Sequence, residues 1–146
     1  MNTCGKIMMV DDDQKLGQSY KRSLKRLGLE IEIYDSAQKA LSDLTSDWPG
    51  IVVTDIMMPG IDGLTVMKKV KYFDPDLPVV LVTGRGDIPM AVEAIRDGAY
   101  DFLEKPVEME SLQKVMEHAL EKRRFVLELR KLRAQIASYD QSSLTL

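Results

Sequence analysis

Four short apolar runs divide the chain, and each is closed by a polar residue or a turn. Three of them, 6–10, 51–54 and 79–82, are apolar nearly throughout, as parallel strands covered on both faces are. The fourth, 100–103, carries an acidic residue at its second position. A fifth run, 30–34, alternates polar and apolar residues, which is typical of an edge strand with one solvated face. The pattern predicts five strands.

Segments with helical spacing lie between these runs. Apolar residues three or four positions apart predict helices over 14–27, 63–73 and 88–96. Ser36 is a suitable N-cap for a further helix that reaches Leu44. Strands and helices therefore alternate along the chain with short connections. This alternation predicts an α/β fold with a doubly wound, five-stranded parallel sheet and right-handed crossovers.

The last predicted helix is longer than a small sheet can cover. It begins near Met109, and no Gly or Pro interrupts it before about Ser138. At 1.5 Å per residue it would be about 45 Å long, roughly twice the length that the sheet can use. Beyond the part that can pack on the sheet, apolar residues recur at heptad spacing. We call these residues the seam: Phe125, Leu129, Leu132 and Ile136, with Tyr139 continuing the spacing.

The second half of this helix has two possible interpretations. The helix could be a solvated single helix that frays beyond Lys122, but several apolar side chains would then be exposed without a reason. A parallel coiled coil with a second copy explains them better, although Lys122 would weaken that stripe where it falls on it. The basic cluster 122–124 lies beside Glu121 and Glu128, which favours a solvated surface over a nucleic-acid contact. We therefore expect a compact domain over 1–120 and a coiled-coil linker helix over 121–146.

Composition narrows the class of protein further. Of 146 residues, 45% are hydrophobic and 29% are charged, which excludes a disordered or collagen-like chain. A net charge of −3 argues against a domain whose main task is to bind nucleic acid. The single cysteine, Cys4, cannot form an internal disulfide, and no stretch approaches the roughly 18 apolar residues of a membrane span. These features predict a cytoplasmic protein.

Polar side chains with useful chemistry follow four of the predicted strands. In a sheet of order 2-1-3-4-5 the carboxyl ends of these four strands lie side by side around the switch point, where ligands bind. Converging carboxylates repel one another unless a hard cation takes oxygen ligands from them, and Mg²⁺ suits such a site. A lysine and a hydroxyl beside the cation could hold phosphoryl oxygens. The residues are Asp11, Asp12 and Asp13 after the first strand, Asp55 after the third, Thr83 after the fourth and Lys105 after the fifth.

Each of these positions also has an ordinary structural explanation. An acidic triplet after a strand is often a turn and an N-cap, and a threonine before Gly84 could simply end a strand. Lys105-Pro106 could be a plain turn, whereas Asp55 is an unusual charge beside a buried strand. One chemical group at each of four strand ends makes coincidence improbable. The joint pattern, more than any single residue, predicts a functional site.

With these residues at its strand ends, the sequence resembles the receiver domain of two-component response regulators. The segments that carry the resemblance are MMVDDD (8–13), VTDIMMPGIDG (53–63), LVTG (81–84) and EKP (104–106), and the similarity extends from about Lys6 to Leu120. Within that family, VTGRGDIPMAV (82–92) and GAYDFL (98–103) resemble the NtrC-type branch. With EKRR (121–124) following, the chain is most similar to regulators of C4-dicarboxylate transport.

The resemblance implies a role for each matching residue. Asp55 would accept a phosphoryl group and, with Asp12 and the backbone carbonyl of Met57, would bind Mg²⁺ directly, while Asp11 would act through a water. Thr83 and Lys105 would contact the phosphoryl group. The bond before Pro106 is expected to be cis, and Phe102 matches the family's switch aromatic. Asp13 lies outside the acidic pair and is interpreted as a helix cap.

The resemblance also implies partners and a wider context. The phosphoryl donor would be a phosphohistidine on a sensor histidine kinase, and the chain would be a regulatory domain rather than an enzyme. His118, the only histidine, lies in the last helix and is interpreted as a surface or interface residue. An NtrC-type regulator would continue with an ATPase and a DNA-binding domain. We expect this chain to be a fragment of such a sigma-54-dependent activator, without direct nucleic-acid or membrane contact.

Two rival functions use similar residues. An aspartate-nucleophile phosphohydrolase also places Asp, Thr, Lys and Mg²⁺ at parallel strand ends, but it carries a second acid two residues after the nucleophile, where this chain has Met57. A dimerisation module that has lost phosphorylation would not need the intact carboxylates and Lys105. Both rivals are therefore less favoured than the receiver interpretation.

Overall fold

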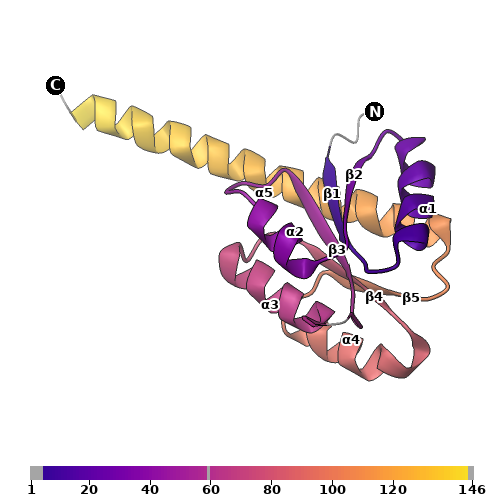
Figure 1. Ribbon diagram of the computed structural model, residues 1–146. Coiled ribbons are helices and arrows are strands. Elements are labelled where there is room, and N and C mark those ends of the chain that lie inside the picture. The colour runs from indigo at the N-terminus through magenta and orange to yellow at the C-terminus, as the bar shows by residue number, and fades with distance from the viewer. Residues whose placement is uncertain (1–4, 59, 145–146) are drawn as a thin grey trace.

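A computed structural model of the chain describes residues 5–58 and 60–144, the side chains of 141–144 excepted. Five parallel strands form one sheet, as the strand pattern predicted, and their order, β2-β1-β3-β4-β5, is the one that the polar strand ends indicated (Figure 1). The edge position of β2 agrees with its alternating sequence, since Glu30 and Glu32 are exposed while Ile31 is buried. Cys4 lies outside the described residues.

The strands begin and end within one or two residues of the expected positions. β3 and β4 are longer than their apolar runs, because the backbone of Asp55 and of Thr83 still pairs with the neighbouring strand. Both side chains therefore stand at the last position of a strand, where the backbone is fixed by its ladder. The strands are β1 (Lys6–Val10), β2 (Glu30–Tyr34), β3 (Gly50–Asp55), β4 (Val79–Thr83) and β5 (Asp101–Glu104).

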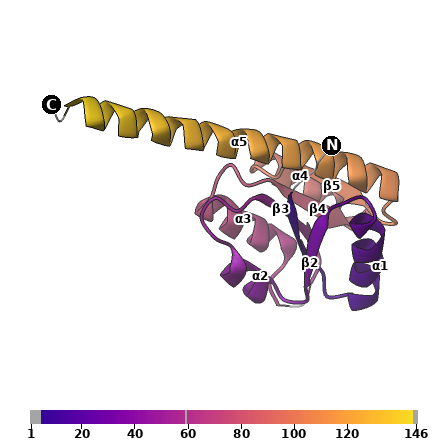
Figure 2. The same cartoon turned by 90° about the horizontal axis from the view of Figure 1, so that it is seen from above.

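Helices cover both faces of the sheet, and each face has its own hydrophobic core. α1 and α5 lie on one face, where Leu24 and Met116 are buried, and α2, α3 and α4 lie on the other, where Val66 and Ala91 are buried (Figure 2). The three central strands β1, β3 and β4 are almost wholly buried between these layers, whereas the edge strands β2 and β5 are partly exposed. The helices are α1 (Gln14–Lys25), α2 (Ala37–Asp43), α3 (Gly63–Phe73), α4 (Ile88–Arg96) and α5 (Met109–Leu144), with a short 3₁₀ turn, η1 (Arg85–Asp87), before α4.

Local capping explains where α1 and α2 begin and end. The side chain of Asp13 accepts the N–H of Leu16 at 3.1 Å, and Ser36 accepts that of Lys39 at 3.4 Å, so both are N-caps as predicted. α1 ends at Lys25, two residues earlier than expected, because the N–H of Leu27 bonds the carbonyl three positions back and tightens the last turn.

α5 is one continuous helix of 36 residues that begins where the sequence predicted and ends several residues later than expected. Its first half packs on the sheet through Leu112, Met116 and Ala119, and its second half extends past the amino-terminal ends of the strands, away from the body (Figures 1 and 2). No helix in the described part of the chain is both long enough and apolar enough to span a membrane.

The interpretation of 122–124 as solvated surface is wrong for one of its residues. Arg123 is 1% exposed, and its guanidinium donates to the carbonyl of Trp48 and to the carboxylate of Asp74, both at 2.8 Å. The prediction failed because the charge run was interpreted without the helix phase: Arg123 lies on the same face of α5 as the packed residues before it. Arg124, by contrast, is exposed.

Candidate functional site

The four chemical groups meet at one edge of the sheet because their strands are parallel and in register. Val10 pairs with Thr54, Asp55 with Val82 and Thr83 with Glu104, so the carboxyl ends of β1, β3, β4 and β5 stand side by side. Asp11 and Asp12 follow β1 directly, and Lys105 follows β5. The geometry is that of the switch point of a doubly wound sheet, between β1 and β3.

Three carboxylates converge at this edge. Oxygen atoms of Asp11, Asp12 and Asp55 lie within 4.8 Å of one another, and Asp11 and Asp55 are only 4% and 6% exposed. Asp12 is exposed and closes the group on the solvent side. An all-oxygen donor set with excess negative charge fits a hard divalent cation such as Mg²⁺, which one or two carboxylates and several waters satisfy.

Lys105 is the positive partner within this group. Its Nζ lies 2.6 Å from Oδ2 of Asp55, a short charge-assisted hydrogen bond. Burial acts to lower the pKa of Lys105, but the hydrogen bond and charge of Asp55, together with Asp11, outweigh it and leave that pKa raised. Lys105 is therefore held in its charged form beside Asp55.

Asp11 has no comparable compensation. Burial raises the pKa of its carboxyl, and the neighbouring charges of Asp55 and Asp12 act in the same direction. The N–H of Asp13, which donates to Oδ1 of Asp11 at 2.8 Å, and the charge of Lys105 offset only part of this effect. The crevice thus holds more negative charge than its own residues neutralise, which is the condition under which a cation binds.

The loop after β3 fixes the second oxygen of Asp55. Its Oδ1 accepts the backbone N–H of Met57 at 3.2 Å, so both carboxylate oxygens are oriented. Gly63, the first residue of α3, lies against the same segment: a Cβ there would stand 2.3 Å from the carbonyl oxygen of Asp55. Only glycine permits that approach. From sequence, Gly63 was predicted only as the start of a helix, because its contact is with a residue eight positions earlier.

Thr83 is the last residue of β4, and Phe102 lies in the neighbouring strand β5, two residues before its end. The hydroxyl of Thr83 is buried and donates to the carbonyl of Gly84 at 3.1 Å. Phe102 is half-buried, packs against the core on the α4 side and pairs in register with Leu81, two residues before Thr83. The Lys105–Pro106 peptide bond is cis.

One buried residue near the site was not predicted. Tyr20 of α1 is 6% exposed, and its pKa is raised by burial and then by the charge of Asp11. The sequence offered only its helical spacing, which identified it as a core residue. His118, by contrast, is exposed on α5 and does not belong to the site.

Comparison with known proteins places this geometry in a family. The model of the response regulator receiver domain matches residues 7–117, which is most of the chain. The C4-dicarboxylate transport transcriptional regulatory protein DctD of Rhizobium meliloti (strain 1021) is 47% identical over 133 residues, covering 91% of this chain and 29% of that protein. The DNA-binding transcriptional regulator NtrC of Salmonella typhimurium (strain LT2) is 34% identical over 116 residues, covering 80% of this chain and 25% of that protein.

A solved structure agrees in fold as well as in sequence. The response regulator StyR superposes with a TM-score of 0.87 at 30% identity, covering 94% of this chain and 70% of that one. The chain spans less than a third of the length of the two transcriptional regulators. The strand order, the acidic group at the switch point and these similarities agree: the chain belongs to the response regulator receiver domain family, with relatives among the NtrC-type regulators.

Proposed function

We propose that this chain accepts a phosphoryl group on Asp55, in a Mg²⁺-dependent transfer from a phosphohistidine of a sensor histidine kinase. The observation that carries the proposal is the group formed by Asp55, Asp11 and Asp12 within 4.8 Å, with Lys105 at 2.6 Å. In-line phosphoryl transfer needs a positioned nucleophile and positive charge beside the phosphoryl oxygens. Asp55 would supply the nucleophile, and Lys105 together with Mg²⁺ held by the carboxylates would supply the positive charge. A kinase partner and the lone cysteine both favour a place in the cytoplasm.

Each residue of the site would have its own role in the phosphoryl transfer. Asp55 attacks phosphorus with one carboxylate oxygen, and the leaving imidazole takes the bond's electron pair. Lys105, which pairs with the Asp55 carboxylate before the transfer, contacts the phosphoryl oxygens after it. The Thr83 hydroxyl donates a hydrogen bond to one of these oxygens. Asp12, Asp55 and the Met57 carbonyl would hold Mg²⁺, with Asp11 acting through a water. Bound Mg²⁺ would neutralise the carboxylates and the phosphoryl oxygens.

Phosphorylation would be read out through Thr83 and Phe102. The new charge, about −1.5 to −2, would draw the Thr83 hydroxyl away from the Gly84 carbonyl and open space for the ring of Phe102. Movement of the ring would shift a pre-existing equilibrium of the face formed by β4, β5, α4 and α5. A Thr83→Ala variant should take up phosphate but lose the accompanying change in association; an unchanged response would contradict this coupling.

The output of the switch would be a change in association with a second copy. Phe125, Leu132 and Ile136 are 65%, 49% and 61% exposed, and Leu129 is partly buried, so the seam forms an apolar stripe on α5. A coiled coil between two copies would cover that stripe. The relatives' names indicate transcriptional regulation, and we infer that the controlled output is a sigma-54-dependent activator.

The rival phosphohydrolase is less well supported by the same site. The position two residues after Asp55 is Met57, whose side chain is 56% exposed and cannot act as an acid or base. Release of inorganic phosphate from monoesters in steady turnover by the purified chain would favour the rival over our proposal.

The decisive experiment is labelling with acetyl phosphate and Mg²⁺, followed by intact mass and peptide mapping. The parent should gain a single phosphoryl group at Asp55, and Asp55→Asn should gain none. Asp35→Asn is the matched control, because Asp35 is an exposed aspartate that lines the same edge and forms an exposed ion pair with Lys39 at 3.5 Å. Equal labelling of Asp55→Asn and the parent would overturn the proposal. No labelling of the parent would favour the module that only dimerises.

A further inference from the structure

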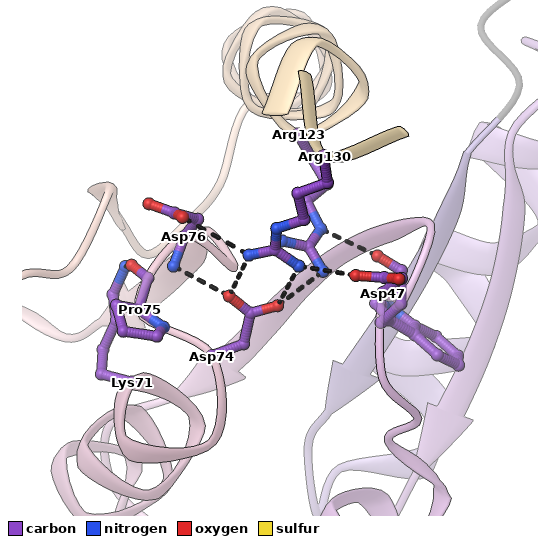
Figure 3. A network of polar contacts seen from close by, with 8 residues as sticks. Asp47, Lys71, Asp74, Pro75, Asp76, Arg123 and Arg130 are labelled. Carbon is purple, nitrogen blue, oxygen red and sulfur yellow. Dashed lines mark hydrogen bonds and ion pairs between the residues drawn. The ribbon is translucent and has the colours of Figure 1, made fainter. Parts of the chain in front are cut away.

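A buried acid lies at the amino-terminal ends of the strands, opposite the candidate site, and takes no part in that site. Asp74 follows α3, is 6% exposed, and stands beside the amino-terminal ends of β3 and β4. Its carboxylate accepts from two arginines of α5 (Figure 3). We call Asp74, Arg123 and Arg130 the clamp.

The clamp joins distant parts of the chain by short contacts. Arg123 donates to Oδ2 of Asp74 at 2.8 Å, and Arg130 donates to Oδ1 at 2.8 Å and to Oδ2 at 3.1 Å. Arg130 also reaches Asp47 at 2.7 Å and Asp76 at 3.4 Å. These hydrogen bonds and charges outweigh burial and hold the pKa of Asp74 well below its usual range. The charge of Asp74 is therefore fully matched.

The spacing of the two arginines allows the clamp to determine the direction of α5. Seven residues are two turns of helix, so both side chains leave the same face of α5, about 10 Å apart along its axis. One contact would allow the helix to pivot, whereas two contacts along its length determine its direction. Both converge on a single carboxylate of the body, which α3 and the following turn hold in place.

The clamp also determines which face of α5 looks outward. Phe125 and Leu132 each follow a clamp arginine by two residues, a rotation of about 200° around the helix. The apolar residues are accordingly exposed while Arg123 is 1% exposed. Holding the arginines against the body therefore turns the seam away from it.

We propose that Asp74 is a positioning residue: through Arg123 and Arg130 it fixes the direction and the rotation of α5 beyond the sheet. The rigid body then extends to Arg130 rather than ending at Leu120. The part of α5 that follows projects from it in one direction, with the seam facing outward. That a second copy uses the seam rests on the proposed function; the direction of the helix does not.

The chemistry of the clamp suits this role better than a role in stability alone. Burying a charged pair costs solvation, and apolar residues of the same volume often stabilise a fold as well or better. One nitrogen of the buried Arg123 guanidinium even lacks a hydrogen-bond partner among the described residues. Directional contacts, in contrast, define one arrangement of helix on body, which apolar packing specifies less strictly.

The test is a distance measurement between spin labels on the whole chain. Labels are attached at Glu93→Cys on α4 and Ala134→Cys on α5, both exposed and outside the seam, in a Cys4→Ser background diluted with unlabelled protein. The parent should give one narrow distance distribution. Asp74→Asn and Arg130→Met should each broaden it by about two-fold or more, because the extension is then held only by its first half.

Controls separate this role from a general loss of structure. Asp76→Asn removes only the 3.4 Å contact and should leave the distribution narrow. Labelling of Asp55 and helix content should be unchanged in the variants, and if Asp74→Asn does not fold, the partly exposed Arg130 provides the test. A narrow distribution at the parent distance in a folded Asp74→Asn or in Arg130→Met would overturn the proposal. Sedimentation of the same samples reports dimerisation separately, so failure of the proposed function would not be mistaken for failure of the clamp.

Discussion

Two buried aspartates at opposite edges of the sheet carry opposite electrostatic character. Asp11, at the carboxyl edge, has its pKa raised by burial and by two neighbouring carboxylates. Asp74, at the amino edge, is buried to a similar degree, yet its pKa is lowered because Arg123 and Arg130 both donate to it. The same residue type is therefore left uncompensated at one edge and fully matched at the other.

This contrast distinguishes a binding site from a structural contact. An uncompensated group stores unfavourable energy that a ligand can relieve, which supports the proposal that the carboxyl edge binds a cation and accepts a phosphoryl group. A matched group gains nothing from a ligand and instead fixes the arrangement of the elements it joins.

The largest effect is expected at the matched edge. Asp74→Asn leaves the buried Arg123 guanidinium without its counter-charge and should lower the free energy of unfolding by about 3 kcal/mol. Urea denaturation at fixed protein concentration measures it. Asp76→Asn serves as the control and should change that free energy by no more than about 0.5 kcal/mol. Similar values for the two variants would mean that the clamp contributes no more than an ordinary surface pair.

Magnesium should act only at the uncompensated edge. Binding to the folded state at ten times Kd should raise the free energy of unfolding by about 1.4 kcal/mol. Asp74→Asn should show the same increment, since the two sites share no residues. Thermal unfolding with and without Mg²⁺ checks this, and an increment that depends on Asp74 would show that the edges are coupled.

Acid should reduce the stability that the clamp contributes, because the unfolded chain binds a proton on Asp74 at a higher pH than the folded chain does. A carboxyl whose pKa is lowered by folding stabilises the fold at pH values above its unfolded pKa, and this contribution is lost as pH falls toward the folded value. The advantage of the parent over Asp74→Asn should therefore be constant above about pH 5 and shrink by about 1 kcal/mol by pH 3. Urea titrations at several pH values test this; an advantage that shrinks instead as pH rises would contradict the assignment.

The smallest effects belong to exposed ion pairs. Lys114 and Glu110 lie 3.7 Å apart on α5 with side chains 71% and 81% exposed. Lys114→Gln should change the free energy of unfolding by less than about 0.5 kcal/mol. A larger effect, measured in the same denaturation series, would mean that exposure is a poor guide to which charges matter here.

The carboxyl edge could be predicted from sequence because each of its residues is marked by its immediate neighbours in the chain. Each of Asp11, Asp55 and Thr83 comes at the end of an apolar run, and parallel strands bring such ends together whatever the details of packing. The parallel sheet and most helix limits followed from the alternation of strands and helices, and the strand order was indicated by the polar strand ends. The orientation of Asp55 by Gly63 was missed, since backbone approach leaves no mark in hydrophobic periodicity.

The amino edge could not be predicted in the same way. Asp74 precedes a proline and has the sequence of a helix terminator, while its partners lie 49 and 56 residues away. One signal was available: Leu112, Met116, Ala119 and Arg123 are spaced four, three and four apart, so the buried face of α5 continues into the arginine. Judging the charge run by composition instead of helix phase concealed it.

The most direct test of the contrast is the free energy of unfolding of Asp11→Asn, measured by urea denaturation with EDTA and with Mg²⁺. Removing one of three buried or converging carboxylates should make the variant about 1 kcal/mol more stable than the parent in EDTA. The variant should also lose most of the stabilisation by Mg²⁺. An Asp11→Asn protein that is less stable than the parent in EDTA, yet stabilised by Mg²⁺ as strongly as the parent, would contradict the account.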